Sequence, residues 1–386
     1  MTLLVHDFAY DFGGAERVTA ELADAFPDAR VLAVGGREDV FERMGVAERA
    51  ATILPAGRFA GSYRSLSPLL PRIVRRTVDE PVISSSYAFA HHVRSRSLHV
   101  EYCHSPLRQL WIAENRYRQT GGRVLSGGMR AFGDHLRELD LKAVADVDVI
   151  VASCENVRKR VERIYGREAL VVHPPVTLTT FYPDAVDREG DLVLLVARLV
   201  EPYKQVRSAL EMFASLPFRL AVVGDGRDAA ALRAVAPPNA IFVGRAGDDD
   251  LRRWYSRAAV VLFPGEDDFG LVPVEAMACG TPVVALDAGG ARETVTDGVT
   301  GLRYPTPDDL RSALEQALNR RWDSDAIRNH AQGFSSDTFV ERMREIVRNA
   351  LSGAQRRRHL SGSARAGALG SSSPVGQPSI AADSGR

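Results

Sequence analysis

The stretch FPGEDDFGLVPVEAMACGTPVVALDAGGARET, residues 263–294, decides the fold. It begins at the end of an apolar run that is typical of a buried strand, and an acidic loop, residues 266–268, follows. Pro273 is expected at the first position of a helix, where its missing N–H costs nothing, and Gly280 where that helix stops. A second apolar run, residues 282–286, predicts the next strand. This alternation predicts a parallel α/β sheet that binds ligands at the carboxyl ends of its strands.

Two carboxylates stand close to the start of this helix. Asp267 lies in the acidic loop, and Glu275 follows eight residues later in the first helical turn. The start of a helix attracts anions, so two carboxylates beside it suit a ligand that also carries hydroxyl groups, such as a ribose or a hexose. The alternative is that Glu275 only complements the helix dipole and that Asp267 is a solvated loop charge. This stretch alone leaves both interpretations open.

Length and composition bound the class of protein. A chain of 386 residues predicts two domains, and 45% hydrophobic with 25% charged residues is ordinary for a globular protein. A formal net charge of zero gives no general attraction to nucleic acid, so no nucleic-acid partner is expected. The three cysteines form no CxxC pair, which favours a reduced, cytoplasmic chain. No leader precedes the first strand, and no apolar run reaches the ~18 residues of a spanning helix.

Basic residues gather in one part of the chain. Residues 57–130 contain 12 arginines against four acidic residues, and the segment 69–76 mixes them with apolar residues. Such a segment is compatible with contact to anionic lipid head groups at the inner face of a membrane. A solvated helix face and a wall that faces an anionic substrate are the other two interpretations.

The first half predicts one domain, residues 1–180. Strands are expected over residues 2–6, 31–34, 81–84, 98–102, 147–152 and 170–173. Gly13-Gly14 connect a strand to a helix, which presents backbone N–H groups to a phosphate, although tight packing also explains such a pair. His104 follows a strand and precedes a helix, so it lies at the ligand edge of the sheet. A loop histidine with satisfied hydrogen bonds is the alternative.

The connections and the second half follow the same pattern. A helix is expected through His91-His92, and residues 121–128 are expected to form a flexible glycine-rich turn before a helix over residues 129–145. Residues 182–191 resemble a linker, and a second α/β domain is predicted over residues 190–335. A helix is predicted over residues 336–351. The tail, residues 352–386, has almost no large apolar residues and is expected to be disordered.

Charged residues follow two strands of the predicted second sheet. Arg198 and Lys204 come after one strand, and Asp267, Gly270 and Glu275 come after another. Because parallel strands end at the same edge, all five are expected near one another. Two cations, a helix start and two carboxylates suit a diphosphate that carries a sugar at each end.

Taken together, these motifs resemble the retaining family-4 glycosyltransferases of GT-B fold. The motif DDFGLVPVEAMACG, residues 267–280, is similar to the E-x7-E signature of that family. Further matches, in chain order, are Gly13-Gly14-Ala15-Glu16, Tyr102-Cys103-His104-Ser105-Pro106, His173-Pro174-Pro175-Val176, Arg198 with Lys204, and Gly289-Gly290 with Glu293. The resemblance covers nearly all of residues 2–351. It implies an α/β protein with two Rossmann-like domains that face a central cleft and a C-terminal helix that crosses back to the first domain.

The resemblance also implies roles for single residues. Arg198 and Lys204 would bind the donor diphosphate, Glu275 would hold the ribose, and Asp267 would contact the transferred sugar. Backbone N–H groups of the pairs Gly13-Gly14 and Gly270-Leu271 would assist, and His104 would line the reaction centre. The implied donor is a nucleotide-sugar, GDP-mannose first and a UDP-sugar second, with no metal or other cofactor. The implied acceptor is a glycan, a lipid-linked molecule or a small molecule, as in bacterial surface-polysaccharide mannosyltransferases.

The sequence departs from that pattern at two places. Asp267 stands where the family usually has Glu, and Glu266 lies one residue earlier. An Asp commonly follows the tryptophan that matches Trp111, but here Ile112-Ala113-Glu114 stands instead. Two other functions therefore stay open: a sugar-nucleotide epimerase or phosphorylase on the same fold, and a protein that binds nucleotide-sugars without catalysis.

Overall fold

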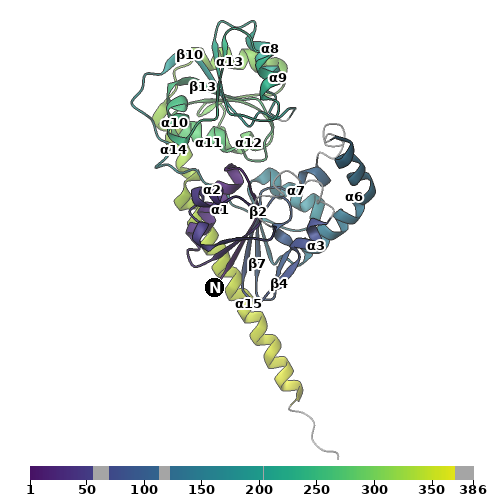
Figure 1. Cartoon of the computed structure of the whole chain (residues 1–386). Helices are drawn as coiled ribbons and strands as arrows, with labels where there is room; N and C mark the ends of the chain where they lie inside the picture. Colours follow the sequence, from purple (N-terminus) through teal and green to yellow (C-terminus); the bar gives the residue numbers. More distant parts are fainter. Residues whose placement is uncertain (55–68, 113–121, 203, 370–386) are drawn as a thin grey trace, which may run out of the picture.

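The computed structural model describes residues 1–54, 69–112, 122–202 and 204–369, and it shows two α/β domains (Figure 1). The first domain holds a seven-stranded sheet in the order β3-β2-β1-β5-β7-β8-β9, and the second holds a six-stranded sheet in the order β12-β11-β10-β13-β14-β15. Every strand pair is parallel. The prediction of two α/β domains with parallel sheets is therefore confirmed.

The first domain uses residues up to Val171 for its sheet. Its strands are β1 Leu3–Ala9, β2 Arg30–Gly36, β3 Ala50–Thr52, β5 Val82–Ser86, β7 His99–Cys103, β8 Val149–Ala152 and β9 Leu170–Val171, with a separate pair, β4 Arg76–Val78 and β6 Val93–Ser95. Its helices are α1 Gly14–Ala25, α2 Glu38–Arg43, α3 Leu70–Val74, α4 Arg108–Trp111, α6 Gly122–Ala145 and α7 Glu155–Tyr165. Helices on both faces bury the central strands, and every residue of β1 is buried.

The second domain begins its sheet at Glu189. Its strands are β10 Glu189–Val196, β11 Arg219–Val223, β12 Ala240–Gly244, β13 Ala258–Phe263, β14 Val283–Leu286 and β15 Gly301–Tyr304. Its helices are α8 Val206–Phe213, α9 Ala229–Arg233, α10 Asp248–Arg257, α11 Leu271–Ala278, α12 Ala291–Thr294, α13 Leu310–Asn319 and α14 Ser324–Ala331. The segment between the two sheets is packed in place, because Val176 bridges to Ser335 and Phe181 is buried.

The stretch 263–294 folds as strand, loop, helix, strand and turn, but its helix begins earlier than predicted. α11 starts at Leu271, so Pro273 is the third helical residue and not the first. Gly270 turns the chain into the helix with φ 81°, and a Cβ there would lie 2.7 Å from the ring of Phe263. Pro273 still costs no hydrogen bond, because the first N–H groups of a helix lack partners within it. Gly280 ends the helix with φ 73°, as predicted.

Two connections of the first domain differ from the prediction. The expected helix through His91-His92 is a single 3₁₀ turn, Ala90–His92. The buried carboxylate of Asp7 fixes this turn by accepting hydrogen bonds from the N–H groups of Tyr87, Ala88, Phe89 and Ala90 at 2.6–2.7 Å. The predicted flexible turn at residues 121–128 is wrong from Gly122 onward, because α6 already begins there. Single glycines are tolerated inside a helix at a cost of about 1 kcal/mol.

The C-terminal helix, α15 Ser336–Leu369, crosses back to the first domain, as predicted (Figure 1). Phe339 and Met343 belong to the same buried cluster as Val18 and Leu22 of α1. The helix does not end at Leu351. Helix-forming residues such as alanine, arginine, glutamine and leucine carry it past the expected start of the tail. The rest of the predicted tail, residues 370–386, lies outside the described residues.

Candidate functional site

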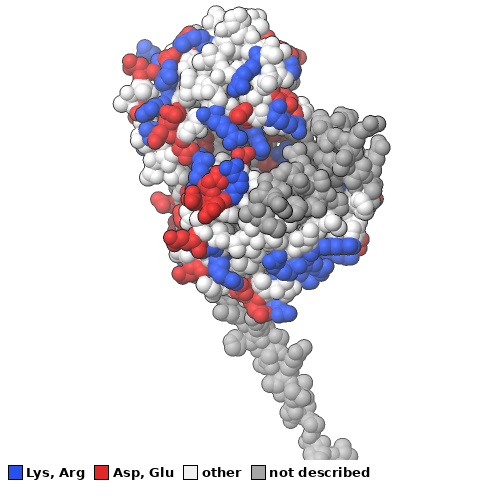
Figure 2. All heavy atoms as spheres, viewed as in Figure 1, with Lys and Arg blue, Asp and Glu red and all other residues white. Residues whose placement is uncertain are grey.

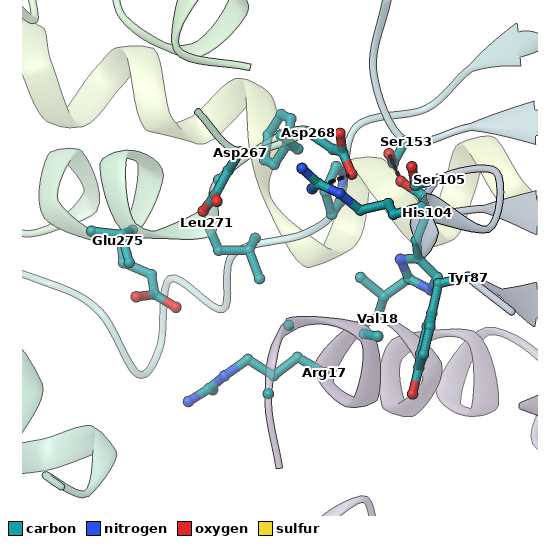
Figure 3. A pocket seen from close by; sticks show the side chains of 18 residues that line it. Arg17, Val18, Tyr87, His104, Ser105, Ser153, Asp267, Asp268, Leu271 and Glu275 are labelled. Atoms are coloured by element: carbon teal, nitrogen blue, oxygen red, sulfur yellow. Dashed lines mark hydrogen bonds and ion pairs between the residues drawn. The ribbon is translucent and has the colours of Figure 1, made fainter. Parts of the chain in front are cut away.

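A cavity of about 480 Å³ lies between the two domains (Figure 3). Both domains line it, through Gly13, Gly14, Arg17, Tyr87, His104 and Arg108 from the first and through Asp267, Asp268, Gly270, Leu271 and Glu275 from the second. Seven residues that the sequence singles out therefore meet here: Gly13, Gly14, His104, Asp267, Gly270, Leu271 and Glu275. Arg198 and Lys204 are not among the lining residues.

Asp267 of the acidic loop faces the cavity and pairs with Lys204. Nζ of Lys204 lies 2.6 Å from Oδ1 and 2.5 Å from Oδ2 of Asp267. Glu266, whose side chain is 54% exposed, instead lies 3.7 Å from Arg160 of the first domain. Of the two neighbouring carboxylates, Asp267 is thus the one that the fold directs into the cavity. Lys204 stands directly behind it.

The glycine pair after β14 is required by the position of this loop. The N–H of Gly290 donates to the carbonyl oxygen of Asp267 at 3.0 Å. A Cβ on Gly289 would lie 2.2 Å from that same oxygen, and Gly289 has φ 55°. Any other residue at Gly289 would push the acidic loop away, so the pair holds Asp267 in place.

Glu275 forms the buried end of the cavity. The hydroxyl of Tyr255 donates to its Oε2 at 2.7 Å, and the residue is 6% exposed. Burial raises the pKa of Glu275, although the nearby guanidinium of Arg17 acts in the opposite direction. Such a carboxylate is a hydrogen-bond acceptor held in a fixed direction, which suits a ligand that presents hydroxyl groups.

Arg198 lies outside the lining of the cavity. Its side chain is 71% exposed, and its Nη2 lies 3.6 Å from Oδ2 of Asp11 in the first domain. Arg245 approaches the other oxygen of Asp11 at 3.1 Å. Within the described residues Arg198 pairs with Asp11 and Lys204 pairs with Asp267, so the shared role of Arg198 and Lys204 at a diphosphate stays a prediction.

The glycine pair of the first domain offers fewer donors than predicted. The N–H of Gly13 already donates to Oε2 of Glu16 at 2.9 Å. The backbone of Gly14 begins α1 and lies against Leu271, because a Cβ on Gly14 would be 3.2 Å from that side chain. The pair therefore allows the two domains to approach closely, and only N–H groups from Gly14 onward remain for a ligand.

Sequence reasoning missed the residues that join the two domains. Asp268 accepts hydrogen bonds from Arg108, at 3.0 Å, and from Arg160. Arg17 of α1 reaches Asp248 of α10 with two hydrogen bonds. The acidic loop and the motif around Arg108 were both visible in the sequence, but charge alone does not show which partner lies across a cleft.

Glu293 is a further contact between the domains. It accepts hydrogen bonds from the N–H groups of Glu155, at 2.8 Å, and Asn156, at 3.1 Å, which begin α7. Nε2 of His173 lies 3.1 Å from its Oε2. Although burial acts to raise the pKa of Glu293, these hydrogen bonds hold it below its ordinary value. Its position at a helix start is electrostatically favourable, so this motif residue joins the domains.

His104 is the histidine of the cavity wall. Its Nε2 lies 2.8 Å from Oγ of Ser85, and the rings of Tyr102 and Tyr87 contact it edge-on, with centroids 5.2 and 6.2 Å away. Burial lowers the pKa of His104 to about 3, so the imidazole is neutral at physiological pH. A neutral ring suits hydrogen bonding to a ligand better than it suits charge stabilisation.

Within the described residues, the side chains of His91, His92 and Asp140 form the one group with the spacing of a metal site. Asp140 is already occupied, because it accepts hydrogen bonds from Nε2 of His91, Nε1 of Trp111 and the hydroxyl of Tyr165 at 2.7–2.9 Å. This group lies away from the cavity lining and is explained by those bonds. It gives no reason to assign a metal.

Two Rossmann-like domains that face one another across such a cavity define the GT-B class of fold, and solved structures agree. The structure of HepE from Anabaena in complex with UDP superposes with a TM-score of 0.65, covering 90% of this chain and 100% of that one, at 17% identity. Sucrose-phosphate synthase from Thermosynechococcus elongatus gives a TM-score of 0.67, covering 92% and 100%, also at 17% identity. The predicted GT-B fold is confirmed.

Sequence comparison finds a family match within the second domain. Residues 190–320 match the family described as Glycosyl transferases group 1. A D-inositol 3-phosphate glycosyltransferase of Frankia alni is 32% identical over 251 residues, which are 55% of this chain and 61% of the relative. One of Kribbella flavida is 33% identical over 246 residues, 54% and 58% of the two chains. The chain thus spans about three fifths of these relatives, and the second domain carries the family match.

Proposed function

We propose that the protein is a glycosyltransferase that moves a hexosyl group from a nucleotide-sugar to an acceptor bound by the first domain. The observation that carries this proposal is the cavity itself. Asp267 and Glu275 line one side and His104 lines the other, while Lys204 stands behind Asp267. The two carboxylates suit the hydroxyl groups of a nucleotide-sugar, and the cation of Lys204 together with the start of α11 suits its phosphates.

The proposed chemistry is stabilisation of the leaving nucleotide. When the bond between sugar and phosphate breaks, negative charge grows on the phosphate that leaves. Lys204 and the N–H groups of Leu271 and Val272, which begin α11, are the donors that we propose for that charge. Arg198 is proposed to join them when an anionic donor replaces Asp11 as its partner. This requires neither a metal nor a nucleophile from the protein.

The proposal also covers the donor sugar and the stereochemistry of its transfer. We infer retention of configuration and a mannosyl donor, GDP-mannose before a UDP-sugar, on the resemblance of the motif at residues 267–280. HepE was crystallised with UDP and with UDP-glucose, and the curated relatives are named D-inositol 3-phosphate glycosyltransferases. A panel of GDP- and UDP-sugars, with a lipid extract and inositol phosphates as acceptors, tests the choice through release of nucleoside diphosphate.

The two alternatives predict other outcomes of the same panel. An epimerase would convert the sugar of the donor without transferring it to an acceptor. A binding protein without catalysis would hold a nucleotide-sugar tightly and release no nucleoside diphosphate. The ion pair of Lys204 with Asp267, which lines the cavity, supports transfer, because a cation beside the cavity suits a reaction that releases a phosphate.

We also propose that the first domain docks on an anionic membrane surface. Lys and Arg side chains gather over α3 and β4 (Figure 2). Arg72, Arg75 and Arg76 are exposed there, beside Leu69 and Ile73, which are 50% and 40% exposed. Interleaved basic and apolar side chains suit head groups that are anionic above an apolar interior. No helix in the described part of the chain combines the length and apolarity needed to cross a bilayer.

A further inference from the structure

A chain of buried hydrogen bonds runs from His104 into the first domain. Oγ of Ser85 lies 2.8 Å from Nε2 of His104 and 2.8 Å from Oγ1 of Thr19. Oγ1 of Thr19 also lies 2.9 Å from Nδ1 of His6 and 2.8 Å from the carbonyl oxygen of Ala15. Ser85, Thr19 and His6 are all fully buried, so solvent does not compete for these contacts.

The number of protons in this chain decides the direction of each bond. Thr19 has one hydroxyl proton and three neighbours, and the carbonyl oxygen of Ala15 is able only to accept. Thr19 therefore donates to Ala15, and His6, the third neighbour, donates from a protonated Nδ1 to Thr19. Ser85 must then donate to Thr19, and His104 must donate from Nε2 to Ser85. The reverse direction would leave lone pairs of Thr19 and Ala15 facing each other at 2.8 Å, at a cost typical of an unmade buried hydrogen bond.

This direction determines what His104 presents to the cavity. A neutral imidazole carries one N–H, so a proton on Nε2 leaves Nδ1 with a free lone pair. Among the residues that the structure describes, none donates a hydrogen bond to Nδ1 of His104. The ring itself lines the cavity (Figure 3). The vacant acceptor is therefore offered to a ligand.

We propose that Thr19 and Ser85 are positioning residues that hold His104 in the tautomer protonated at Nε2, so that Nδ1 accepts a hydrogen bond from a hydroxyl group of the bound sugar. The identity of that ligand rests on the proposed function, whereas the tautomer does not. A site with a fixed acceptor discriminates against a sugar that lacks this hydroxyl, because the acceptor is then left unpaired.

The tautomer is measured directly in the ligand-free protein. Protonated and unprotonated ring nitrogens of a neutral imidazole give well-separated ¹⁵N signals, and His104→Gln identifies the signals of His104 among the nine histidines. The wild-type protein is expected to show His104 protonated at Nε2. Thr19→Val removes the hydroxyl at nearly constant shape and is expected to shift the proton toward Nδ1, as is Ser85→Ala. The matched control Thr19→Ser keeps the hydroxyl and is expected to keep the wild-type tautomer.

Activity gives the second readout. With the donor found in the panel, Thr19→Val and Ser85→Ala are expected to lose about 10-fold in kcat/KM, the effect of roughly one hydrogen bond, while Thr19→Ser stays within about 2-fold. A wild-type His104 protonated at Nδ1, or an unchanged tautomer in both variants, overturns the proposal. If no donor is turned over, the proposed function fails, but the ¹⁵N spectra still decide the tautomer. If Thr19→Val does not fold, Ser85→Ala and the wild-type spectrum suffice.

Discussion

Lys204 and Asp267 form an ion pair at the edge of the cavity, with Nζ 2.6 and 2.5 Å from the two carboxylate oxygens. They come from the ends of neighbouring strands, since Lys204 follows β10 and Asp267 follows β13. In the ligand-free protein each neutralises the other. Under the proposed function, a nucleotide-sugar would offer phosphate to Lys204 and hydroxyl groups to Asp267, so that one ligand would satisfy both charges.

Removing the charge of Asp267 is therefore expected to impair turnover. Asp267→Asn should lower kcat/KM about 10-fold or more, because a charged acceptor for the sugar is lost, and initial rates of nucleotide release measure this. Glu266→Gln is the matched control, since Glu266 is exposed and faces Arg160. Equal losses in the two variants would contradict the assignment of Asp267 as the carboxylate of the site.

Asp268 is expected to matter for stability more than for binding. It takes hydrogen bonds from Arg108 and Arg160, and the side chains of Asp268 and Arg160 are 14% and 11% exposed. Asp268→Asn leaves the mostly buried Arg160 with only the exposed Glu266, 3.7 Å away, as a counter-charge, so the free energy of unfolding should fall by roughly 2–3 kcal/mol. Chemical denaturation measures the loss. Asp249→Asn, at an exposed site on α10, is the control. A similar small change in the free energy of unfolding of both variants would contradict a stabilising role for the contacts of Asp268 with Arg108 and Arg160.

The stability of the protein is expected to peak near pH 6.5. Burial lowers the pKa of His92, His99 and His104 to about 3. Below pH 6.5 these histidines are protonated in the unfolded chain but stay neutral in the folded chain, so the free energy of unfolding falls as the pH falls. Glu101, whose pKa burial raises to about 7, opposes this with a single group. The three histidines therefore outweigh Glu101, and the free energy of unfolding falls below pH 6.5.

On the alkaline side His91 dominates. Although burial alone would lower it, Glu101 and Asp140 hold the pKa of His91 at about 9, so its contribution to stability is lost as pH rises from 6.5 to 9. Melting temperatures between pH 4.5 and 9 measure both limbs. In His91→Gln the fall between about pH 8 and 9 should disappear, while the acid fall and the smaller fall that Glu101 contributes near pH 7 remain. A wild-type melting temperature that stays level from pH 6.5 to 9 would show that His91 is not protonated in the fold.

Membrane docking is tested on vesicles. Changing Arg72, Arg75 and Arg76 together to serine should weaken binding to vesicles that contain phosphatidylglycerol by about 100-fold or more, at about 1 kcal/mol per arginine. Co-sedimentation at low and high salt measures it. The control replaces three exposed arginines of the second domain, Arg311, Arg320 and Arg321. Equal binding by both triple variants would remove the patch on α3 and β4 from consideration.

The sequence predicted the fold well because local signals were strong. Buried strands read as continuous apolar runs, and Gly280 marked the end of α11. The predicted boundaries of helices and turns were wrong where contacts between distant parts of the chain determine them. Asp7 lies more than 80 residues from the turn at Phe89 that it shapes, and no local pattern shows that bond. The prediction of disorder over residues 352–369 was wrong for another reason. The scarcity of large apolar residues indicates that the segment buries little surface, but it does not exclude a helix.

The site was predicted in part for the same reason. Residues at strand ends lie at the ligand edge of a sheet by topology, so spacing made Asp267, Glu275 and His104 candidates, and the family resemblance chose the functional interpretation over the alternatives. The contact of Arg198 with Asp11 of the other domain was not predicted, and its role at a diphosphate stays a prediction. The bonds from Arg108 and Arg160 to Asp268 were missed as well. Contacts across a cleft depend on how two domains meet, and that information is spread over the whole chain.

One measurement tests the central claim most directly: release of nucleoside diphosphate from a panel of GDP- and UDP-sugars, with acceptor present, by the wild-type protein and by Lys204→Ala. The account predicts turnover of at least one donor by the wild type. It also predicts a loss of about 10²-fold or more in kcat/KM for Lys204→Ala, with little change in melting temperature. Lys142→Ala, at an exposed helical site, should behave as wild type. Tight donor binding without release, or near-normal turnover by Lys204→Ala, would contradict it.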